Sequence, residues 1–483
     1  MGQEINKRRF DNSDFDLFAI KLKNETELLR QWFAESRFES DKLMAGLELE
    51  ACLVDSNFRP AAVNETFFET ADSDYLTPEL AKFNIELNVD ALPLNTGVLT
   101  GLRQSLQQHW HNCRRAAQLM ATDVIAVGIL PTLTDADLST ENMSKMVRYE
   151  ALNEQVLSKR KGKPLRLNIV GKENLQSLHY DVMLESAATS LQIHLQVPQE
   201  KAVAYYNASV FVSAFTVAAA ANSPFLFGKS LWEESRIPLF EQAVESGGFD
   251  AAANGPLHRV SFGSDYCRQS LMECFDENLK HFPVLLPMNF ATAPQALQHL
   301  RLHNGTIWRW NRPIIGFNDK HEPHLRIEHR VMPAGPTITD QLANIALYYG
   351  LVNYFAEQDT VKSEMKAFST AKDNFYNAAR FGLKASVKWS DGNSYSLQKL
   401  FKEVLLDYAA LGLRKLGVDK KDSDFYLHVI KQRVASGRTG SNWQQMFVRR
   451  YGKDMRLMTQ QYFIRQNSDK AVHQWDWSII DAE

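Results

Sequence analysis

Four short segments of the chain alternate between apolar and polar residues, which is the period of a half-buried β-strand. They span residues 46–53, 83–89, 191–197 and 325–331, and in each segment the apolar side chains share one face. The opposite faces carry the ionisable or amide side chains Glu48, Glu50, Glu86, Asn88, Gln192, His194, Arg326, Glu328 and Arg330. Glu is disfavoured in strands, and like charges repel when they face each other across a sheet. We therefore expect a cationic group to neutralise these carboxylates.

A divalent metal ion is the cation that this set of side chains favours. Carboxylate oxygens are the usual ligands of Mg²⁺, often together with substrate phosphates, and one imidazole such as that of His194 is compatible with Mg²⁺ or Mn²⁺. Arg330 shares a strand face with Glu328, and its planar guanidinium suits a phosphate that the same metal holds. The alternative for any single strand is a solvated polar face, and for Arg330 a cross-strand ion pair with a glutamate.

Apolar residues at helical spacing predict a second set of elements near residues 13–33, 101–120, 202–221, 340–356, 397–413 and 424–434. Ser13 and Asp16 are typical of a capping box at the start of the first helix. Residues 202–221 carry no charge and are long enough for a membrane span, but their tyrosine, serine and asparagine side chains favour a buried core helix. The segment from Ser436 to Ser441 favours a helix C-cap and turn, with a mobile lid over an anionic substrate as the alternative.

The composition is that of an ordinary soluble enzyme. The 483 residues are 45% hydrophobic and 23% charged, with a formal net charge of -3, and nothing in this balance favours nucleic acid as a partner. There is no low-complexity linker and no repeat. We expect a helical segment over residues 1–40, a catalytic antiparallel-sheet core over 41–340, and a helical region over 341–483 packed on that core.

The start of the chain lacks the apolar segment of a secretory signal. The four cysteines, Cys52, Cys113, Cys267 and Cys274, show no metal-binding or redox-pair spacing. We therefore expect reduced thiols in a cytoplasmic protein. Cys52 follows Glu50 on the polar face, and we interpret it as a packing residue, because nothing near it in sequence lowers its pKa.

Common nucleotide and hydrolase motifs are absent. The chain has no glycine-rich phosphate-binding loop ending in Lys-Ser or Lys-Thr, no dinucleotide fingerprint and no Gly-x-Ser-x-Gly turn. His321-Glu-Pro-His324 is one residue short of a zinc-peptidase motif, and Pro323 would break the helix that such a motif needs. If a nucleotide binds, carboxylate-held metal and arginines must hold it.

The order and spacing of several segments resemble the second glutamate–cysteine ligase family, the carboxylate–amine ligases, over about residues 40–340. The matching segments are Gly46-Leu-Glu-Leu-Glu50, Glu86, Gly128-Ile-Leu-Pro131, Arg148-Tyr149, the strand around His194, Ala221-Asn-Ser-Pro-Phe225, Thr306-Ile-Trp-Arg-Trp310 and Arg326-Ile-Glu-His-Arg330. The resemblance implies a glutamine-synthetase-like α+β fold, in which helices cover a curved antiparallel sheet that forms a funnel with metals on its concave face. The histidine strand here follows residues 185–190 instead of a glycine-containing turn, which leaves the substrates open.

The family resemblance also implies roles for single residues. The metal ligands would be Glu48, Glu50, Glu86, His194 and Glu328, with Glu79 evenly balanced between a further ligand and a surface carboxylate. Arg330 would bind phosphate and act catalytically with Glu328 and Glu50. Substrate or nucleotide would contact Arg148, Arg309, Arg312, Asn88 and Gln192, and Trp308 and Trp310 would shape the wall. The alternative roles are core packing for the tryptophans and ion pairing for Arg309 and Arg312.

The implied activity is ATP-dependent ligation of a carboxylate to an amine through an acyl phosphate, with ATP and Mg²⁺ or Mn²⁺ as cofactors. The default substrates of the family are L-glutamate and L-cysteine, so we expect small-molecule partners, no nucleic acid and no membrane, with homo-oligomerisation left open. Two alternatives remain at this point. One is a metal-dependent phosphotransferase like the phosphagen kinases, and the other is a non-catalytic binding protein of the same fold.

Overall fold

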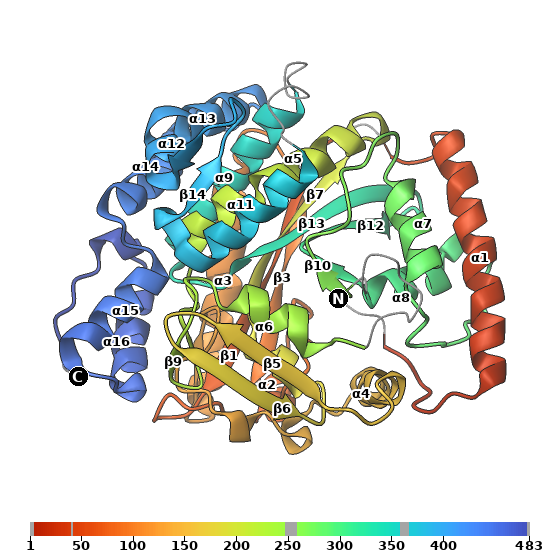
Figure 1. Ribbon diagram of the computed structural model, residues 1–483, viewed down its shortest axis with the longest axis horizontal. Helices are drawn as coiled ribbons and strands as arrows, with labels where there is room; N and C mark the ends of the chain where they lie inside the picture. The colour runs from red at the N-terminus through yellow and green to blue at the C-terminus, as the bar shows by residue number, and fades with distance from the viewer. Residues whose placement is uncertain (1–3, 40–41, 247–257, 358–366, 481–483) are drawn as a thin grey trace.

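A seven-stranded antiparallel sheet lies at the centre of the protein (Figure 1). The computed structural model describes residues 4–39, 42–246, 258–357 and 367–480. The strand order is β12-β13-β7-β1-β3-β2, and β4 pairs with the end of β1 beyond β7. The strands are β1 Met44–Val54, β2 Leu76–Pro78, β3 Asn84–Pro93, β4 Asp123–Ile125, β7 Ser190–Val197, β12 Asn311–Phe317 and β13 Pro323–Pro333. All four strands predicted from the alternating segments are present, and they are neighbours in the sheet.

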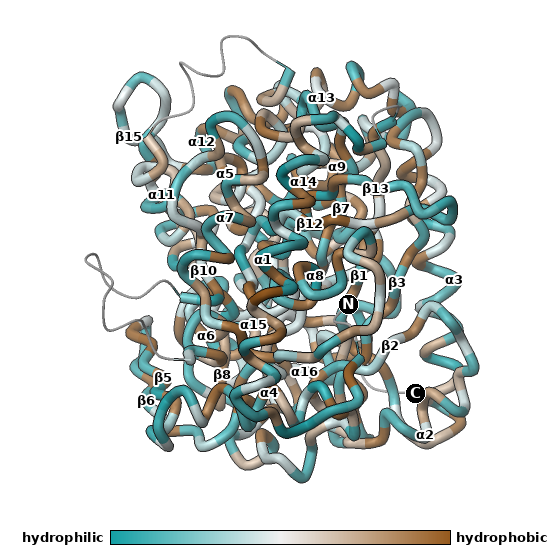
Figure 2. Tube along the Cα trace, turned by 90° about the vertical axis from the view of Figure 1, so that its right-hand side faces the viewer, coloured by the Kyte–Doolittle hydropathy of each residue, from teal (hydrophilic) through white to brown (hydrophobic). Residues whose placement is uncertain are grey.

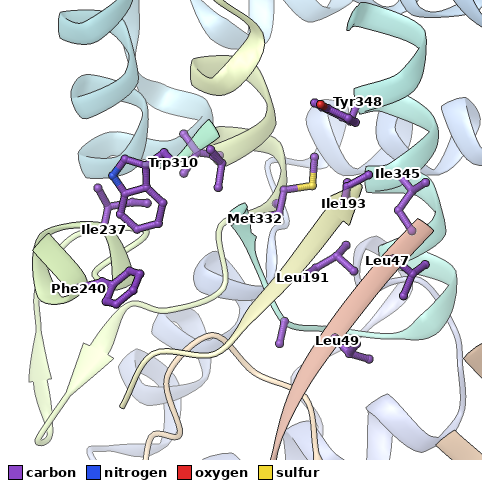
Figure 3. Close-up of a cluster of buried hydrophobic side chains, with 14 of the residues drawn as sticks. Leu47, Leu49, Leu191, Ile193, Ile237, Phe240, Trp310, Met332, Ile345 and Tyr348 are labelled. Atoms are coloured by element: carbon purple, nitrogen blue, oxygen red, sulfur yellow. The ribbon is translucent and has the colours of Figure 1, made fainter. Parts of the chain in front are cut away.

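Helices cover the apolar face of the sheet. The helices α5 (Gln199–Ala220) and α9 (Ile338–Ala356) pack there, and the hydroxyl of Tyr349 in α9 donates a hydrogen bond of 2.9 Å to the carbonyl of His194 in β7. Figure 3 shows the apolar side chains of β1 and β7 meeting Ile345 and Tyr348 of α9. The alternation along the strands thus separates an apolar face under helices from a polar face.

The helix α5 is long and apolar enough to cross a membrane by length and composition. In this structure 89% of an apolar 18-residue stretch of α5 is buried inside the protein. Figure 2 shows the helix among other elements of the chain, coloured by hydropathy. The prediction of a buried core helix is confirmed.

The N-terminal helix α1 (Asn12–Ala34) runs along one flank of the protein, red in Figure 1. The predicted cap at Ser13 and Asp16 is wrong, because the side chain of Asp11 accepts from the first turn and Asp14 returns the bond. Near its middle, Glu25 accepts a 2.5 Å hydrogen bond from His299 and a 2.8 Å bond from the amide of Leu300. This contact attaches α1 to α8.

The first two thirds of the chain also contain further helices and short strands around the sheet. They are α2 Asn64–Ala71, α3 Val98–Leu119, α4 Val147–Lys159, α6 Arg236–Ala243, α7 Met272–His281 and α8 Gln298–Gly305, with the short strands β5 Leu165–Val170, β6 Asn174–His179, β8 Phe225–Leu226, β9 Lys229–Ser230, β10 Val260–Ser261 and β11 Trp308–Arg309. The α3 helix packs on β3, and β5 and β6 form a separate hairpin.

The C-terminal region is helical, blue in Figure 1. Its elements are α11 Phe368–Phe381, β14 Ser386–Lys388, β15 Ser394–Ser396, α12 Leu397–Leu400, the π-helical turn η6 Phe401–Leu405, α13 Leu406–Lys415, α14 Lys420–Ser436, α15 Gly440–Tyr451 and α16 Met455–Asn467. The backbones of α13 and α9 touch at Gly412, where an added Cβ would lie 1.8 Å from the carbonyl oxygen of Gly350. The helices α13 and α14 pack on α9 and form a second layer behind the sheet.

The segment from Ser436 to Ser441 connects α14 to α15. Gly437 ends α14 in the left-handed conformation with φ of 65°, and the side chain of Thr439 caps α15. Arg438 donates hydrogen bonds of 2.8 and 2.6 Å to the carbonyls of His473 and Trp475 and lies over the ring of Trp477. The structure thus shows the predicted C-cap and turn, with Arg438 holding the end of the chain.

We expect Arg438→Ala to leave the kinetics of the protein unchanged and to lower its free energy of unfolding by about 1–3 kcal/mol. The reason is the loss of two charge-assisted hydrogen bonds and one cation–π contact at the C-terminal segment. Urea unfolding and steady-state assays measure both effects, with the exposed Arg449→Ala in the neighbouring helix as control. A raised KM with unchanged stability would instead support the alternative that the segment from Ser436 to Ser441 is a mobile lid.

Candidate active site

The polar face of the sheet opens into a cavity of about 210 Å³. The sheet contributes to its lining Glu48, Glu50, Glu86, Gln192, His194, Arg312, Arg326, Glu328 and Arg330. Strand register brings these residues together, because Glu48 is paired with Gln192, Glu50 with Glu86, and His194 with Glu328. The side chains predicted to share a face therefore line one cavity.

Three of these residues form a compact cluster. The ligand atoms of Glu48, His194 and Glu328 all lie within 4.8 Å of one another, and Nε2 of His194 is 3.1 Å from Oε1 of Glu48. Neither ring nitrogen of the buried His194 makes a hydrogen bond of normal geometry with the described residues. Two carboxylates and one imidazole are ligands that suit Mg²⁺ or Mn²⁺.

Two further carboxylates face each other beside this cluster. Glu50 accepts hydrogen bonds from the amide of Ser190 at 2.6 Å and from Gln192 at 2.8 Å, and Glu86 accepts one from Thr77 at 2.9 Å. Burial and then the charge of Glu79 raise the pKa of Glu50 to about 7. Burial and then the charge of Glu48 raise the pKa of Glu86 well above its ordinary value. Burial and mutual repulsion therefore disfavour the ionised forms of Glu50 and Glu86, and a bound cation would relieve both effects.

The raised pKa of Glu50 predicts a pH dependence of stability in the metal-free protein. The ordinary value is 4.5 and the folded value is about 7, so between these pH values the unfolded chain loses a proton that the folded chain keeps. Stability is then fully present below pH 4.5 and falls as the pH rises to 7, by on the order of 3 kcal/mol.

Urea unfolding in EDTA at several pH values should show this fall in wild type and a smaller one in Glu50→Gln, whose amide does not titrate. Glu403→Gln, which changes an exposed carboxylate on η6, is the control. Equal pH profiles for wild type and Glu50→Gln would contradict the assignment.

Two of the arginines on the polar face, Arg312 and Arg330, are held by Glu328. Arg330 donates from Nε to Glu328 at 2.8 Å and from Nη2 to Gln192 at 2.8 Å, and Arg312 makes two hydrogen bonds, of 3.0 and 2.8 Å, to the same carboxylate. Burial raises the pKa of Glu328, but the charges of Arg312 and Arg330 outweigh it and hold the pKa well below its usual range. The ion pair considered for Arg330 is present, although its partner is on the same strand, and the guanidinium still lines the cavity.

A family model described as glutamate-cysteine ligase family 2 matches residues 44–467. The chain belongs to this family. The match extends past the segment on which the resemblance rested, so the C-terminal helices are part of what the family shares. The expected activity class, an ATP-dependent ligase, is confirmed by this membership. No curated protein sequence matches the chain.

Two solved structures share the fold of this glutamate–cysteine ligase family member. The glutamate–cysteine ligase of Francisella tularensis, solved with AMP, is 12% identical with a TM-score of 0.53, and the similarity covers 92% of this chain and 91% of that one. A bifunctional glutathione synthetase from Pasteurella multocida is 10% identical with the same TM-score of 0.53, and the similarity covers 92% of this chain and 55% of that one. These similarities confirm the predicted fold of a curved antiparallel sheet with helices.

The ligase cavity also contains residues from outside the sheet. Glu79 lines it and lies 3.4 Å from the hydroxyl of Tyr149, whose ring lies under Arg148. Glu185, in the 3-10 turn η3 (Met183–Ala187), lines it as well, and burial followed by the charge of Glu79 raises its pKa to about 8. Sequence reasoning missed Glu185, because a single carboxylate in an irregular turn has no periodicity. The one sequence signal for Glu185 was its position in residues 185–190, where the chain departs from the family pattern.

Two residues assigned to ligand binding lie outside the cavity. Arg309 is buried and donates to Glu277 at 2.5 Å and to Asn278 at 2.6 Å. Its neighbour Trp308 lines the cavity, and adjacent residues of a strand point to opposite sides, so the binding role of Arg309 is not supported. Asn88 lies on the polar face of β3, but its amide donates to Thr77 and to the carbonyl of Tyr75 instead of reaching the cavity.

Trp310 was expected to help shape the cavity wall. It is fully buried, and its indole nitrogen donates a 2.9 Å hydrogen bond to Glu241, which matches the packing alternative.

The cysteines differ in part from the expectation based on spacing. The sulfurs of Cys267 and Cys274 lie 3.5 Å apart in the core, so the fold pairs two thiols that are seven positions apart in sequence. All four cysteines are free and buried. Burial raises the pKa of Cys52 to about 12, in agreement with a packing role and against a nucleophile.

Proposed function

We propose that this ligase joins the γ-carboxylate of L-glutamate to the amine of L-cysteine, with ATP and Mg²⁺. The supporting observation is the position of Arg330 beside the Glu48, His194 and Glu328 cluster in one buried cavity. Ligation requires a carboxylate and a triphosphate to approach each other, and both are anions. A cavity that combines this cation-binding cluster with a fixed guanidinium lowers that repulsion.

The reaction that this geometry supports has two steps. The carboxylate of the acid attacks the γ-phosphorus of ATP, the bond from phosphorus to the bridging oxygen breaks, and ADP leaves. The amine then attacks the carbonyl carbon of the acyl phosphate, inorganic phosphate leaves, and the nitrogen loses a proton. Mg²⁺ held by Glu48, His194 and Glu328 would supply charge neutralisation and polarise the phosphoryl group.

The protein groups contribute positioning to both steps. Gln192 and Glu328 hold Arg330 by two hydrogen bonds, so its remaining N–H groups are oriented toward the cavity before substrate arrives. Arg312 and Arg330 both bind Glu328, so these three side chains together carry one net positive charge beside the transferred phosphoryl group. No covalent enzyme intermediate is needed.

An amino acid substrate is supported by three further residues of the cavity. Arg148 lies over the Tyr149 ring, and the carboxylates of Glu79 and Glu185, on which the charge of Arg330 also acts, line the same region. A cation and two carboxylates together match the α-carboxylate and α-ammonium groups of a zwitterion.

Amine-dependent release of phosphate tests the proposal. Purified protein with Mg·ATP is incubated with pairs from a panel of amino acids and amines, and products are identified by mass spectrometry. We expect phosphate release only when both an acid and an amine are present, with γ-glutamylcysteine as the product. A stable phosphorylated acceptor without ligation would instead indicate the phosphotransferase. No thermal stabilisation by Mg·ATP would indicate a binding protein without this chemistry.

A further inference from the structure

Arg326 lies on β13 two residues before Glu328, and its side chain lines the cavity. Within the described part of the chain it makes no side-chain hydrogen bond and no ion pair, and its Nε is buried without a partner. The charges of Glu48 and Glu328 act on it only from a distance. A guanidinium has five N–H donors, and leaving the buried one at Nε without a partner is costly.

The buried arginines of the described chain differ from Arg326, which is partly buried. Each of them donates hydrogen bonds to a carboxylate or a carbonyl, and this set comprises Arg236, Arg259, Arg309, Arg312, Arg330, Arg433 and Arg465. The fold therefore satisfies its structural arginines internally. Arg326 is the exception, and it faces the one cavity that contains the proposed chemistry.

A second arginine, Arg301 on α8, lines the same part of the cavity. Its side chain makes no hydrogen bond to the described residues, and it lies 5.4 Å from the centre of the Phe317 ring. Burial and then the charge of Arg326 lower the pKa of Arg301. Burial, followed by the charges of Arg326 and Arg301, lowers the pKa of the nearby His324 to about 4. This end of the cavity therefore holds positive charge that the protein itself does not compensate.

The position of Arg326 separates it from the proposed phosphoryl site. Residues 326, 328 and 330 alternate along β13, and a strand rises about 3.3 Å per residue, so Arg326 and Arg330 are roughly 13 Å apart along the strand. Glu328, a member of the cation-binding cluster, lies between them. The register places Arg326 beside Ile314, and Leu300 and Leu302 on either side of Arg301 also line the cavity.

We propose that Arg326 and Arg301 form a second anion subsite, which binds an oxyanion of a substrate at the end of the cavity opposite Arg330. The proposal rests on the ligase function proposed above and adds a binding site to it. Guanidinium groups bind phosphates and carboxylates through the same bidentate geometry. The anion is either the polyphosphate of the nucleotide or the carboxylate of the amino acid that supplies the amine, and the experiment separates these sources.

The test compares Arg326→Met, Arg326→Lys and Arg301→Met with wild type and with Arg114→Met, which changes a partly exposed arginine paired with Asp123 outside the cavity. Calorimetry gives the Kd of Mg·ATP for each protein. Steady-state assays with glutamate compare cysteine with cysteamine, which differs from cysteine only by lacking the carboxylate. Thermal unfolding without ligands checks the fold.

A nucleotide phosphate at the subsite predicts at least a tenfold higher Kd for Mg·ATP in Arg326→Met, with the preference for cysteine over cysteamine unchanged. A carboxylate at the subsite predicts an unchanged Kd and at least a tenfold loss of that preference. Either result supports the subsite, and Arg326→Lys should show a smaller effect because it keeps the charge. The melting temperature without ligand should stay level or rise in Arg326→Met, since an unpartnered charge is removed.

The subsite would be overturned if both Arg326→Met and Arg301→Met leave the Kd and the preference within twofold of wild type. It would also be overturned if Arg326→Met melts well below wild type and Arg301→Met, which changes an exposed side chain, leaves both quantities within twofold, because Arg326 would then be structural. A wild type that binds Mg·ATP but releases no amine-dependent phosphate would refute the ligase function alone. The calorimetric comparison would still decide whether the subsite exists.

Discussion

Arg330→Lys is expected to retain Mg·ATP binding and to lower the rate of ADP formation in a single turnover by about 10²–10³-fold. In the structure Arg330 uses Nε for Glu328 and Nη2 for Gln192, which orients its remaining donors. Lysine keeps the positive charge but cannot bond to both partners and also present a planar pair of donors to a phosphoryl group. Rapid-quench measurement of ADP shows the loss at the acyl-phosphate step directly.

The control for this variant is Arg309→Lys, which changes a buried, ion-paired arginine outside the cavity. It should lose stability without a specific loss of the ADP burst. An Arg330→Lys enzyme with an intact burst but slow amide formation would place Arg330 at the amine instead of the phosphate. Full activity would remove Arg330 from the mechanism.

Glu86→Gln is expected to abolish turnover while the metal-free protein stays as stable as wild type or becomes more stable. Glu86 is buried opposite Glu50, and burial together with the charge of Glu48 raises its pKa, so its ionised form is unfavourable in the empty site. The amide removes that cost and one ligand charge at the same time. Thermal unfolding in EDTA and in Mn²⁺ measures both effects, and stabilisation by Mn²⁺ should be smaller in the variant.

Glu241→Gln is the control, because Glu241 is a partly buried carboxylate outside the cavity whose hydrogen-bond partners are Trp310 and Tyr376. It should lower stability and leave the response to Mn²⁺ intact. If Glu86→Gln fails to fold, the carboxylate is structural and its assignment as a ligand is wrong.

The alternating pattern of the strands carried most of the information about the fold. Because one face of each strand is buried, the hydrophobic positions determine which side chains point to the other face. Glu48, Glu50, His194, Glu328 and Arg330 could therefore be grouped before their strands were known to be neighbours. The register then confirmed that they line one cavity.

Residues outside long strands could not be placed in this way. Arg309 and Arg312 are both basic and close in sequence, but β11 is only two residues long, too short for its alternation to reveal that Arg309 points away. Arg301 is in a helix and Glu185 in an irregular turn, and they reach the cavity through tertiary packing alone. The start of α1 was misplaced for a local reason, since Asp11 competes with Ser13 as a cap and only the backbone geometry decides between them.

The strand order has a consequence for how the chain folds during synthesis. The central strand β1 leaves the ribosome early with Glu48 and Glu50. Its neighbour β7, and β13 on the far side of β7, follow only after long intervening segments. Pairing between such distant segments is slow, because a large loop must close before the contact forms. Until β13 docks, the acidic strands lack the arginines at positions 312 and 330. Newly made chains therefore pass through a stage in which Glu48, Glu50 and Glu86 are present but Glu328 and the arginines have not yet docked, and divalent cations in the medium should accelerate the final docking.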